Sequence, residues 1–209
     1  WTNVTPKDMP DFGRVSQIDA SAFDAGTMYM SVRRPLLNDR APYIFRTTDF
    51  GKTWTKIVNG LGAEDYVHAV REDPARKGLL YAATQHGVYL SYDDGANWQS
   101  LKLNMPDTPI SDLIVEANDL VISSHGRGFW VLDNVAPLRQ ATPAVFASGV
   151  QFNVPQSRFT SVSCALAENC TFVCHNMSAA IWHDGSGDEQ AKTVLKFPCP
   201  PTPPRPSPA

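Results

Sequence analysis

Two eight-residue segments of this chain follow one pattern, [Ser/Thr]-x-Asp-x-Gly-x-x-Trp, and they begin 44 residues apart. The first runs from Thr47 to Trp54 and the second from Ser91 to Trp98. In such a segment the hydroxyl and the carboxylate can bond nearby backbone groups and close a tight turn. Glycine supplies a backbone angle that other residues disfavour, and Trp can pack the turn onto an apolar layer. Recurrence at this spacing predicts a protein built from repeated units.

Apolar segments with strand character surround both turns in the same order. They span 14–18, 27–32, 43–47 and 54–57 in the first unit, and 66–70, 79–84, 87–91 and 98–101 in the second. We expect four antiparallel strands per unit, with the repeated turn between the last two. Four strands in roughly 40–50 residues are typical of a β-propeller blade.

A third unit begins at residue 110 but lacks the repeated turn. Its strand-like segments are 110–115, 119–124 and 128–133, and Asn134-Val-Ala-Pro137 breaks the pattern. Trp1 and the residues after it look like the closing strand of a still earlier blade. We therefore predict an all-β fold, a β-propeller segment of about three four-stranded blades, as an open arc or part of a larger ring. Because closed propellers have four to eight blades, we expect missing partner blades from a longer chain or another copy.

The repeats resemble those of Asp-box, or BNR, proteins, which include bacterial sialidases and sortilin-like receptors. The closer resemblance is to large bacterial BNR-repeat glycosyl hydrolases and sortilin-like repeat proteins. It covers residues 1 to about 140 and is carried by the segments 1–7, 43–54, 71–81, 93–101 and 125–133. The resemblance implies an extracytoplasmic protein, periplasmic or secreted.

Three functions are compatible with that resemblance. The first is the C-terminal propeller portion of a glycosyl-hydrolase-like protein, acting as scaffold and as one wall of a glycan or peptide site. The alternative is a non-catalytic, sortilin-like propeller that binds protein partners. A third is a glycosidase whose acid and base lie on blades outside this chain.

The resemblance also implies that the Asp-box residues are structural. They are Thr47, Asp49, Gly51, Trp54, Ser91, Asp93, Gly95 and Trp98. Glycoside hydrolysis needs two carboxyl groups about 5–10 Å apart around one bond. Asp49 and Asp93 should lie in turns of different blades, where they cannot flank one bond. We therefore predict no catalytic residue, metal or cofactor in this chain.

His125 and Arg127 are the candidate ligand-binding residues. They stand in His125-Gly-Arg-Gly128, where the glycines indicate a bent loop between strands that could present both side chains to an anionic or sugar ligand. The alternative is a structural hairpin in which Arg127 pairs with a neighbouring blade. His86 also precedes a glycine in the second unit, and this recurrence favours the structural alternative.

Charge and hydropathy restrict the partners. A net charge of −3 and a pI near 5.9 give no electrostatic reason to expect nucleic acid. We also expect no membrane span, since no apolar segment is long enough.

Residues 141–209 differ in kind from the rest. They hold all four cysteines, Cys164, Cys170, Cys174 and Cys199, and become Pro-rich and, we expect, disordered from about 197. The cysteines could bind zinc, form disulfides or remain free thiols, and disulfides would allow three pairings. Segments 151–154 and 158–162 could be strands.

Overall fold

The computed structural model describes residues 1–140, 159–167, 171–175 and 194–196, with side chains as far as residue 140. The chain separates into two compact units, residues 1–159 and 160–209. The domain boundary predicted near residue 140 stays a prediction.

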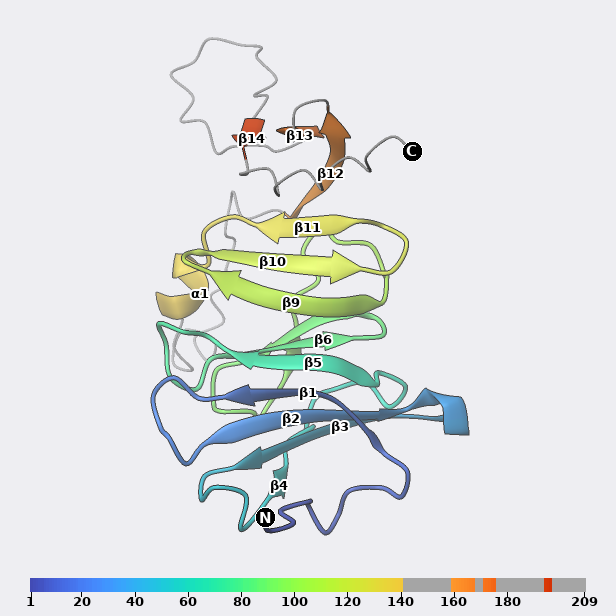
Figure 1. The fold of residues 1–209 in the computed structure, drawn as a ribbon, viewed down its shortest axis with the longest axis vertical. Coiled ribbons are helices and arrows are strands. Elements are labelled where there is room, and N and C mark those ends of the chain that lie inside the picture. The colour runs from blue at the N-terminus through green and yellow to red at the C-terminus, as the bar shows by residue number, and fades with distance from the viewer. Residues whose placement is uncertain (141–158, 168–170, 176–193, 197–209) are drawn as a thin grey trace, which may run out of the picture. The chain divides into compact units, whose positions relative to one another are not determined.

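The first unit contains three antiparallel sheets that follow one another in chain order (Figure 1). The first sheet consists of β1 (Arg14–Ala20), β2 (Met28–Arg34), β3 (Asp39–Thr47) and β4 (Thr55–Lys56). The second consists of β5 (Val67–Glu72), β6 (Leu80–Thr84), β7 (Gly87–Ser91) and β8 (Gln99–Ser100). The third includes β9 (Ile110–Glu116), β10 (Asp119–Ser124) and β11 (Phe129–Leu132). We call these sheets the first, second and third blades. The predicted all-β fold is confirmed.

Two short helices were not expected. The 3₁₀ helix η1 (Pro35–Leu37) joins β2 to β3, and α1 (Ala136–Gln140) follows the third blade. The Asn134 side chain caps α1 by accepting the Ala136 N–H at 3.1 Å, and Pro137 fits the first turn. Segment 134–137 thus ends the strand pattern by starting a helix.

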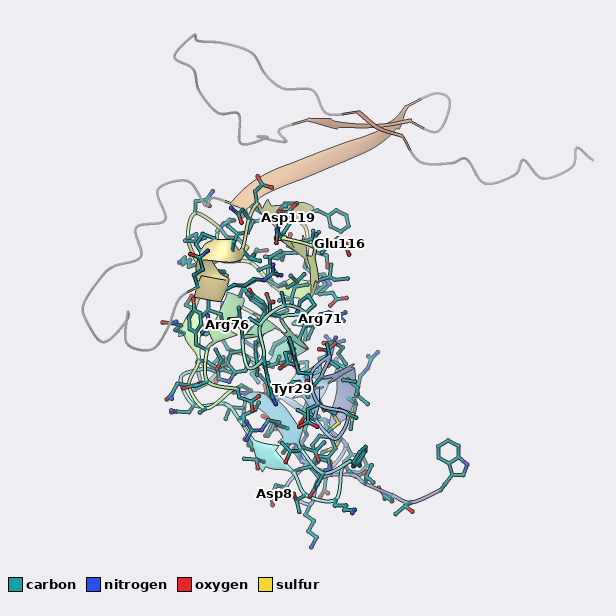
Figure 2. The ribbon with its side chains drawn as sticks, turned by 90° about the vertical axis from the view of Figure 1, so that its left-hand side faces the viewer. Asp8, Tyr29, Arg71, Arg76, Glu116 and Asp119 are labelled. Carbon is teal, nitrogen blue, oxygen red and sulfur yellow. The ribbon has the colours of Figure 1, made fainter. Side chains whose placement is uncertain are left out.

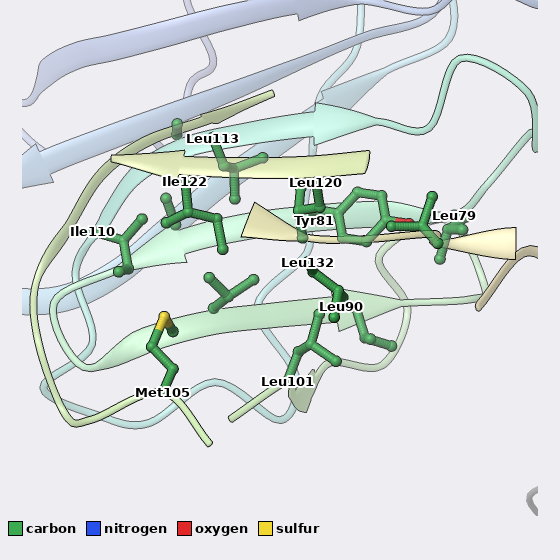
Figure 3. Packing of buried hydrophobic residues seen from close by; sticks show 14 residues of the cluster. Leu79, Tyr81, Leu90, Leu101, Met105, Ile110, Leu113, Leu120, Ile122 and Leu132 are labelled. Carbon is green, nitrogen blue, oxygen red and sulfur yellow. The ribbon is translucent and has the colours of Figure 1, made fainter. Parts of the chain in front are cut away.

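The apolar core lies between the blades. Tyr29 and Ile44 of the first blade pack with Val70 and Leu80 of the second. A larger cluster joins the second and third blades and includes Tyr81, shown with its neighbours in Figure 3. Each blade therefore buries its faces against its neighbours, as stacked repeat units do.

The first strands of the three blades, β1, β5 and β9, lie next to one another. Arg71 on β5 ties them together (Figure 2). Its guanidinium donates to the Asp19 carboxylate on β1 at 3.5 Å, to the Asp112 carboxylate on β9 at 3.2 Å, and to the Leu113 carbonyl. The Asp19 carboxylate also accepts the backbone N–H of Glu72 at 3.0 Å. These innermost strands form the hub that the repeat predicts.

The second unit contains all but the first residue of β12 (Phe159–Ala167), together with β13 (Thr171–His175) and β14 (Val194–Lys196), and these strands pair antiparallel in that order. β12 includes most of the strand predicted at 158–162. Cys164 lies directly opposite Cys174 in the β12–β13 register. The strand predicted at 151–154, Cys170, Cys199 and the Pro-rich end lie outside the described residues.

Candidate functional site

The two ends of the blades carry different residues. At one end the third strand turns into the fourth through segments 47–54 and 91–98, and we call this the Asp-box end. At the opposite end β1, β5 and β9 begin, and the second strand turns into the third through loops 35–38, 85–86 and 125–128. We call this the entry end.

The two Asp-box turns are closed by the same four hydrogen bonds. The Thr47 hydroxyl donates to Asp49 Oδ1 at 2.8 Å and accepts the Gly51 N–H at 2.9 Å. Asp49 also accepts the backbone N–H and the hydroxyl of Thr53, at 2.8 and 2.7 Å. The second turn repeats these bonds at the same distances with Ser91, Asp93, Gly95 and Asn97. Both oxygens of each carboxylate are therefore used within its own turn.

These bonds hold both carboxylates ionised. Hydrogen bonds from the Thr53 N–H and hydroxyl lower the pKa of Asp49 to about 2. Burial works against the ionised form of Asp93, but bonds from Asn97 and Ser91 outweigh it and lower the pKa. A glycosidase acid needs a raised pKa, so neither group has the character of a general acid.

Each Asp-box Trp reaches across to the preceding segment of the repeat. Trp98 is buried and donates its Nε1–H to the Ile57 carbonyl at 2.9 Å. Trp54 donates its Nε1–H to the Val4 carbonyl at 2.7 Å. Val4 follows Trp1 by three residues, just as Ile57 follows Trp54. Residues 1–13 form no strand, contrary to the expectation for Trp1, yet Val4 makes the contact that a closing strand would make.

A pocket of about 440 Å³ lies between residues 55–59 and the second Asp-box turn. Charged groups on its wall are already engaged. Arg46 donates to the Asp94 carboxylate, and the Lys56 ammonium lies 4.3 Å from the centre of the Tyr43 ring. This pocket lies at the interface between two blades, and the polar groups on its wall bond one blade to the other.

The entry end is marked by a β-bulge in the innermost strand of every blade. The register skips one residue between Val15 and Gln17, one between Val67 and Ala69, and one between Ile110 and Asp112. The skipped residues are Ser16, His68 and Ser111. Because a bulge re-aims its extra side chain, the repeat gives each blade one polar side chain at an equivalent position near the start of its innermost strand.

His68 is the most constrained of the three. It is 7 % exposed, and its Nδ1 lies 2.9 Å from the Arg33 guanidinium on β2. A guanidinium only donates, so Nδ1 accepts and the proton of the neutral ring sits on Nε2. Nε2 is buried and has no hydrogen-bond partner within the described residues. Burial, then Arg33 and then His125 lower the pKa of His68 to about 4, while the Gln85 side chain acts in the opposite direction.

Of the two predicted ligand-binding residues, the structure brings only His125 into this group. Its ring centre lies 6.2 Å from that of His68, and its Nδ1 lies 3.1 Å from the Ser111 hydroxyl. The loop bends through positive φ at Gly126 and Gly128, at 76° and 69°. Arg127 is exposed and has no polar partner in the described part of the chain, so the predicted blade-to-blade ion pair does not form there.

His86 occupies the equivalent loop of the second blade but has a different contact. Its Nδ1 lies 3.0 Å from the Asp107 carboxylate. Sequence reasoning missed Arg33, His68 and Ser111 as a group. Aligning the three blades would have placed Ser16, His68 and Ser111 in one column, each after a β-branched residue.

Comparisons with known proteins identify the type of fold. No protein-family model matches this chain, and no curated protein matches its sequence. An ancestral GH74 enzyme is similar in structure, with a TM-score of 0.52 over 81% of this chain and 15% identity. The GH74 enzyme of Niastella koreensis matches 78% of the chain (TM-score 0.48, 14% identity), and YCF48 bound to D1 peptide matches 79% (TM-score 0.44, 13% identity).

The fold is that of a β-propeller segment. The chain spans 22% of the ancestral GH74 enzyme, 26% of the Niastella enzyme and 48% of YCF48. At these identities the likeness concerns the fold alone. In the residues the structure describes, no three His, Cys, Asp or Glu side chains gather as a metal site, and no helix is long and apolar enough to cross a bilayer.

Proposed function

We propose that residues 1–140 are one arc of a larger extracytoplasmic β-propeller protein of the BNR-repeat, glycosyl-hydrolase-like kind. In this proposal the chain is a scaffold whose Asp-box turns fasten neighbouring blades. Its entry end supplies one wall of a site for a glycan or a peptide.

The proposal of a larger propeller rests on a difference in burial between equivalent residues of the three innermost strands. Val70 on β5 and Leu113 on β9 pack against the preceding blade and are 0 % and 2 % exposed. Their equivalent on β1, counted from the bulge, is Ile18, which is 56 % exposed. A preceding blade would cover Ile18 as the first blade covers Val70. The Trp54–Val4 hydrogen bond supports the same arrangement.

The proposed ligand wall rests on the entry end. Each blade has a polar bulge residue at this end, whereas the Asp-box carboxylates at the other end are used in their turns. Loops that connect rigid strands at one end of a propeller are suited to ligand contacts. His125 and Arg127 are exposed on one of these loops.

A second candidate function is a non-catalytic, sortilin-like propeller that binds proteins. Exposed apolar side chains at the entry end favour it. Leu36 on η1 is 94 % exposed and Phe129 on β11 is 56 % exposed. Apolar anchors of this kind suit a protein partner better than a free sugar.

Binding screens on the purified chain test the proposal. Glycan and peptide arrays should each be probed with the wild type, with His125→Ala/Arg127→Ala, and with Lys52→Ala as a control at the Asp-box end. We expect the wild type to bind a glycan or a peptide, the double variant to bind it more weakly, and the Lys52→Ala control to bind it equally well. We expect no hydrolysis of aryl-glycosides or sialosides. Binding that only Lys52→Ala removes would contradict the ligand wall, and clear turnover would contradict the scaffold role.

A further inference from the structure

The entry end of the first two blades holds two arginines that no carboxylate of the described residues pairs with. Arg14 on β1 lies directly opposite Arg33 on β2 in the antiparallel register. Side chains at directly opposed positions share a face of the sheet, with Cβ atoms about 4.5–5.5 Å apart, and like charges there are destabilising. Neither arginine has an ion pair among the described residues, although six such pairs are formed elsewhere in that part of the chain.

Arg33 extends this charge toward the hub. Its Nη1 donates to His68 Nδ1 at 2.9 Å, which turns the Arg33 side chain toward the junction of the first and second blades. His125 adds a second imidazole, 6.2 Å from the His68 ring. The groups that set the charge state of His68 are Arg33, His125 and Gln85, and none of them is acidic.

Three carboxylates of the neighbouring strands and loops have other partners. Asp19 on β1 pairs with Arg71 at the hub, and Asp39 at the start of β3 pairs with Arg34. Asp107 pairs with His86. No carboxylate in the described residues forms an ion pair with Arg14 or Arg33.

A buried donor points to the missing partner. His68 Nε2 carries the proton of the neutral ring, is buried, and makes no hydrogen bond of normal geometry in the described structure, although the Gln85 side chain favours the protonated ring. Leaving a buried donor unpaired costs free energy, and so does placing two arginines opposite each other. An oxygen anion relieves both costs, because it accepts from guanidinium and imidazole N–H groups together.

We propose that Arg14, Arg33, His68 and His125 form an oxyanion site at the entry end, which takes a carboxylate or sulfate group of the ligand. This inference rests on the proposed ligand wall and specifies the chemical group that the wall recognises. Arg14 and Arg33 provide the fixed charge. His68 and His125 donate from the hub side, and His68 becomes easier to protonate once the anion is present.

Titrations with small probes test the site. Sodium glucuronate, sodium sulfate and uncharged glucose should be added to the full chain while the imidazole resonances of His68 and His125 are followed by NMR and the heat by calorimetry. We expect saturable shifts with the two anions and none with glucose. Sulfate binding as tightly as glucuronate indicates a general oxyanion site, and tighter glucuronate indicates a carboxylate carried on a sugar; both outcomes support the inference.

Matched variants locate the binding. Arg33→Gln and Arg14→Gln should each weaken glucuronate binding about tenfold, since each removes a charge-assisted hydrogen bond. Arg40→Gln removes the same charge from an exposed position on β3 and should change little. Arg14 is exposed, so its variant remains informative if Arg33→Gln does not fold.

Two results would overturn the inference. One is the absence of any saturable shift with either anion, and the other is equal glucuronate affinity in the wild type and both arginine variants. If a neutral glycan or peptide from the arrays still binds and depends on His125, the ligand wall stands and only the oxyanion site fails. If nothing binds at all, both proposals fail.

Discussion

Tyr29 of the first blade donates its hydroxyl to Asp94, which belongs to the Asp-box turn of the second blade. The residues are 65 positions apart in sequence. Asp94 also accepts from Arg46 on β3, so one carboxylate joins two strands of the neighbouring blade. Burial, reinforced by the bond to Asp94, raises the pKa of Tyr29 and keeps it protonated as a donor. The Asp-box thus closes a turn and also fastens one blade to the next.

Removing this contact should loosen the junction of the two blades. We expect Asp94→Ala to lower the free energy of unfolding by about 1–3 kcal/mol, because the buried Tyr29 hydroxyl loses its main acceptor. Urea denaturation followed by fluorescence measures the change. Phe50 holds the same position in the first Asp-box and is 69 % exposed, so Phe50→Ala is the matched control and should be nearly neutral. Equal losses for both variants would count against the contact.

The two Asp-box tryptophans should differ in their effect on stability. Trp98 is buried between the first two blades, and Trp98→Ala should cost about 3–5 kcal/mol. Trp54 is only partly buried against Met30, Val32 and Phe45, so Trp54→Ala should cost less. Chemical denaturation of both variants measures the difference. A larger loss for Trp54 would show that the first Asp-box is packed more tightly than the structure indicates.

The pKa of His68 predicts how stability depends on pH. It is lowered to about 4 in the folded chain, from 6.5 for an unperturbed histidine. Between these values the unfolded chain takes up the proton first. The contribution of neutral His68 to the free energy of unfolding is therefore fully present above pH 6.5. As pH falls toward 4, this contribution of about 3 kcal/mol is lost.

Thermal melts between pH 7.5 and 4 check this expectation. The melting temperature of His68→Gln should change less with pH over that window than the melting temperature of the wild type, whatever the stability of the variant at pH 7.5. His86→Gln is the control, since His86 is exposed and lies beside Asp107. Identical slopes for wild type and His68→Gln would mean that the ring is not buried as described.

The register of the second unit predicts a cysteine pairing. Directly opposed residues on antiparallel strands have Cα atoms about 4.5–5.5 Å apart, within the range of a disulfide. If the cysteines oxidise, we expect Cys164 to pair with Cys174, which lies opposite it. Peptide mapping without reduction should recover that cross-linked pair. Recovery of Cys164 linked to Cys170 or Cys199 would contradict the register.

The sequence predicted the strands well, because most of them are short segments rich in apolar residues between clear turn signals. The segment 87–91 matches β7 to the residue, whereas 43–47 covers only the last five residues of β3, which begins at Asp39. The repeated turn pattern also placed the hairpins correctly. These features are local, so spacing and residue type are enough to predict them.

Other features depend on contacts between distant residues. The short helix α1 was missed because Pro137 was taken as a strand breaker, although proline is also compatible with the first turn of a helix. The bulge at His68 depends on how β5 pairs with β6, which composition alone does not show. For the same reason His125 was found from its glycine-rich loop, whereas Arg33, some 90 residues earlier, was not connected with it.

Binding is proposed for the entry end and blade fastening for the Asp-box end, and one paired measurement tests that division most directly. Thermal unfolding and glucuronate titration should both be carried out on His125→Ala and Asp93→Asn. We predict that His125→Ala melts close to the wild type but binds glucuronate more weakly, and that Asp93→Asn melts at a lower temperature but binds as the wild type does. Weaker binding in Asp93→Asn together with unchanged binding in His125→Ala would contradict the account.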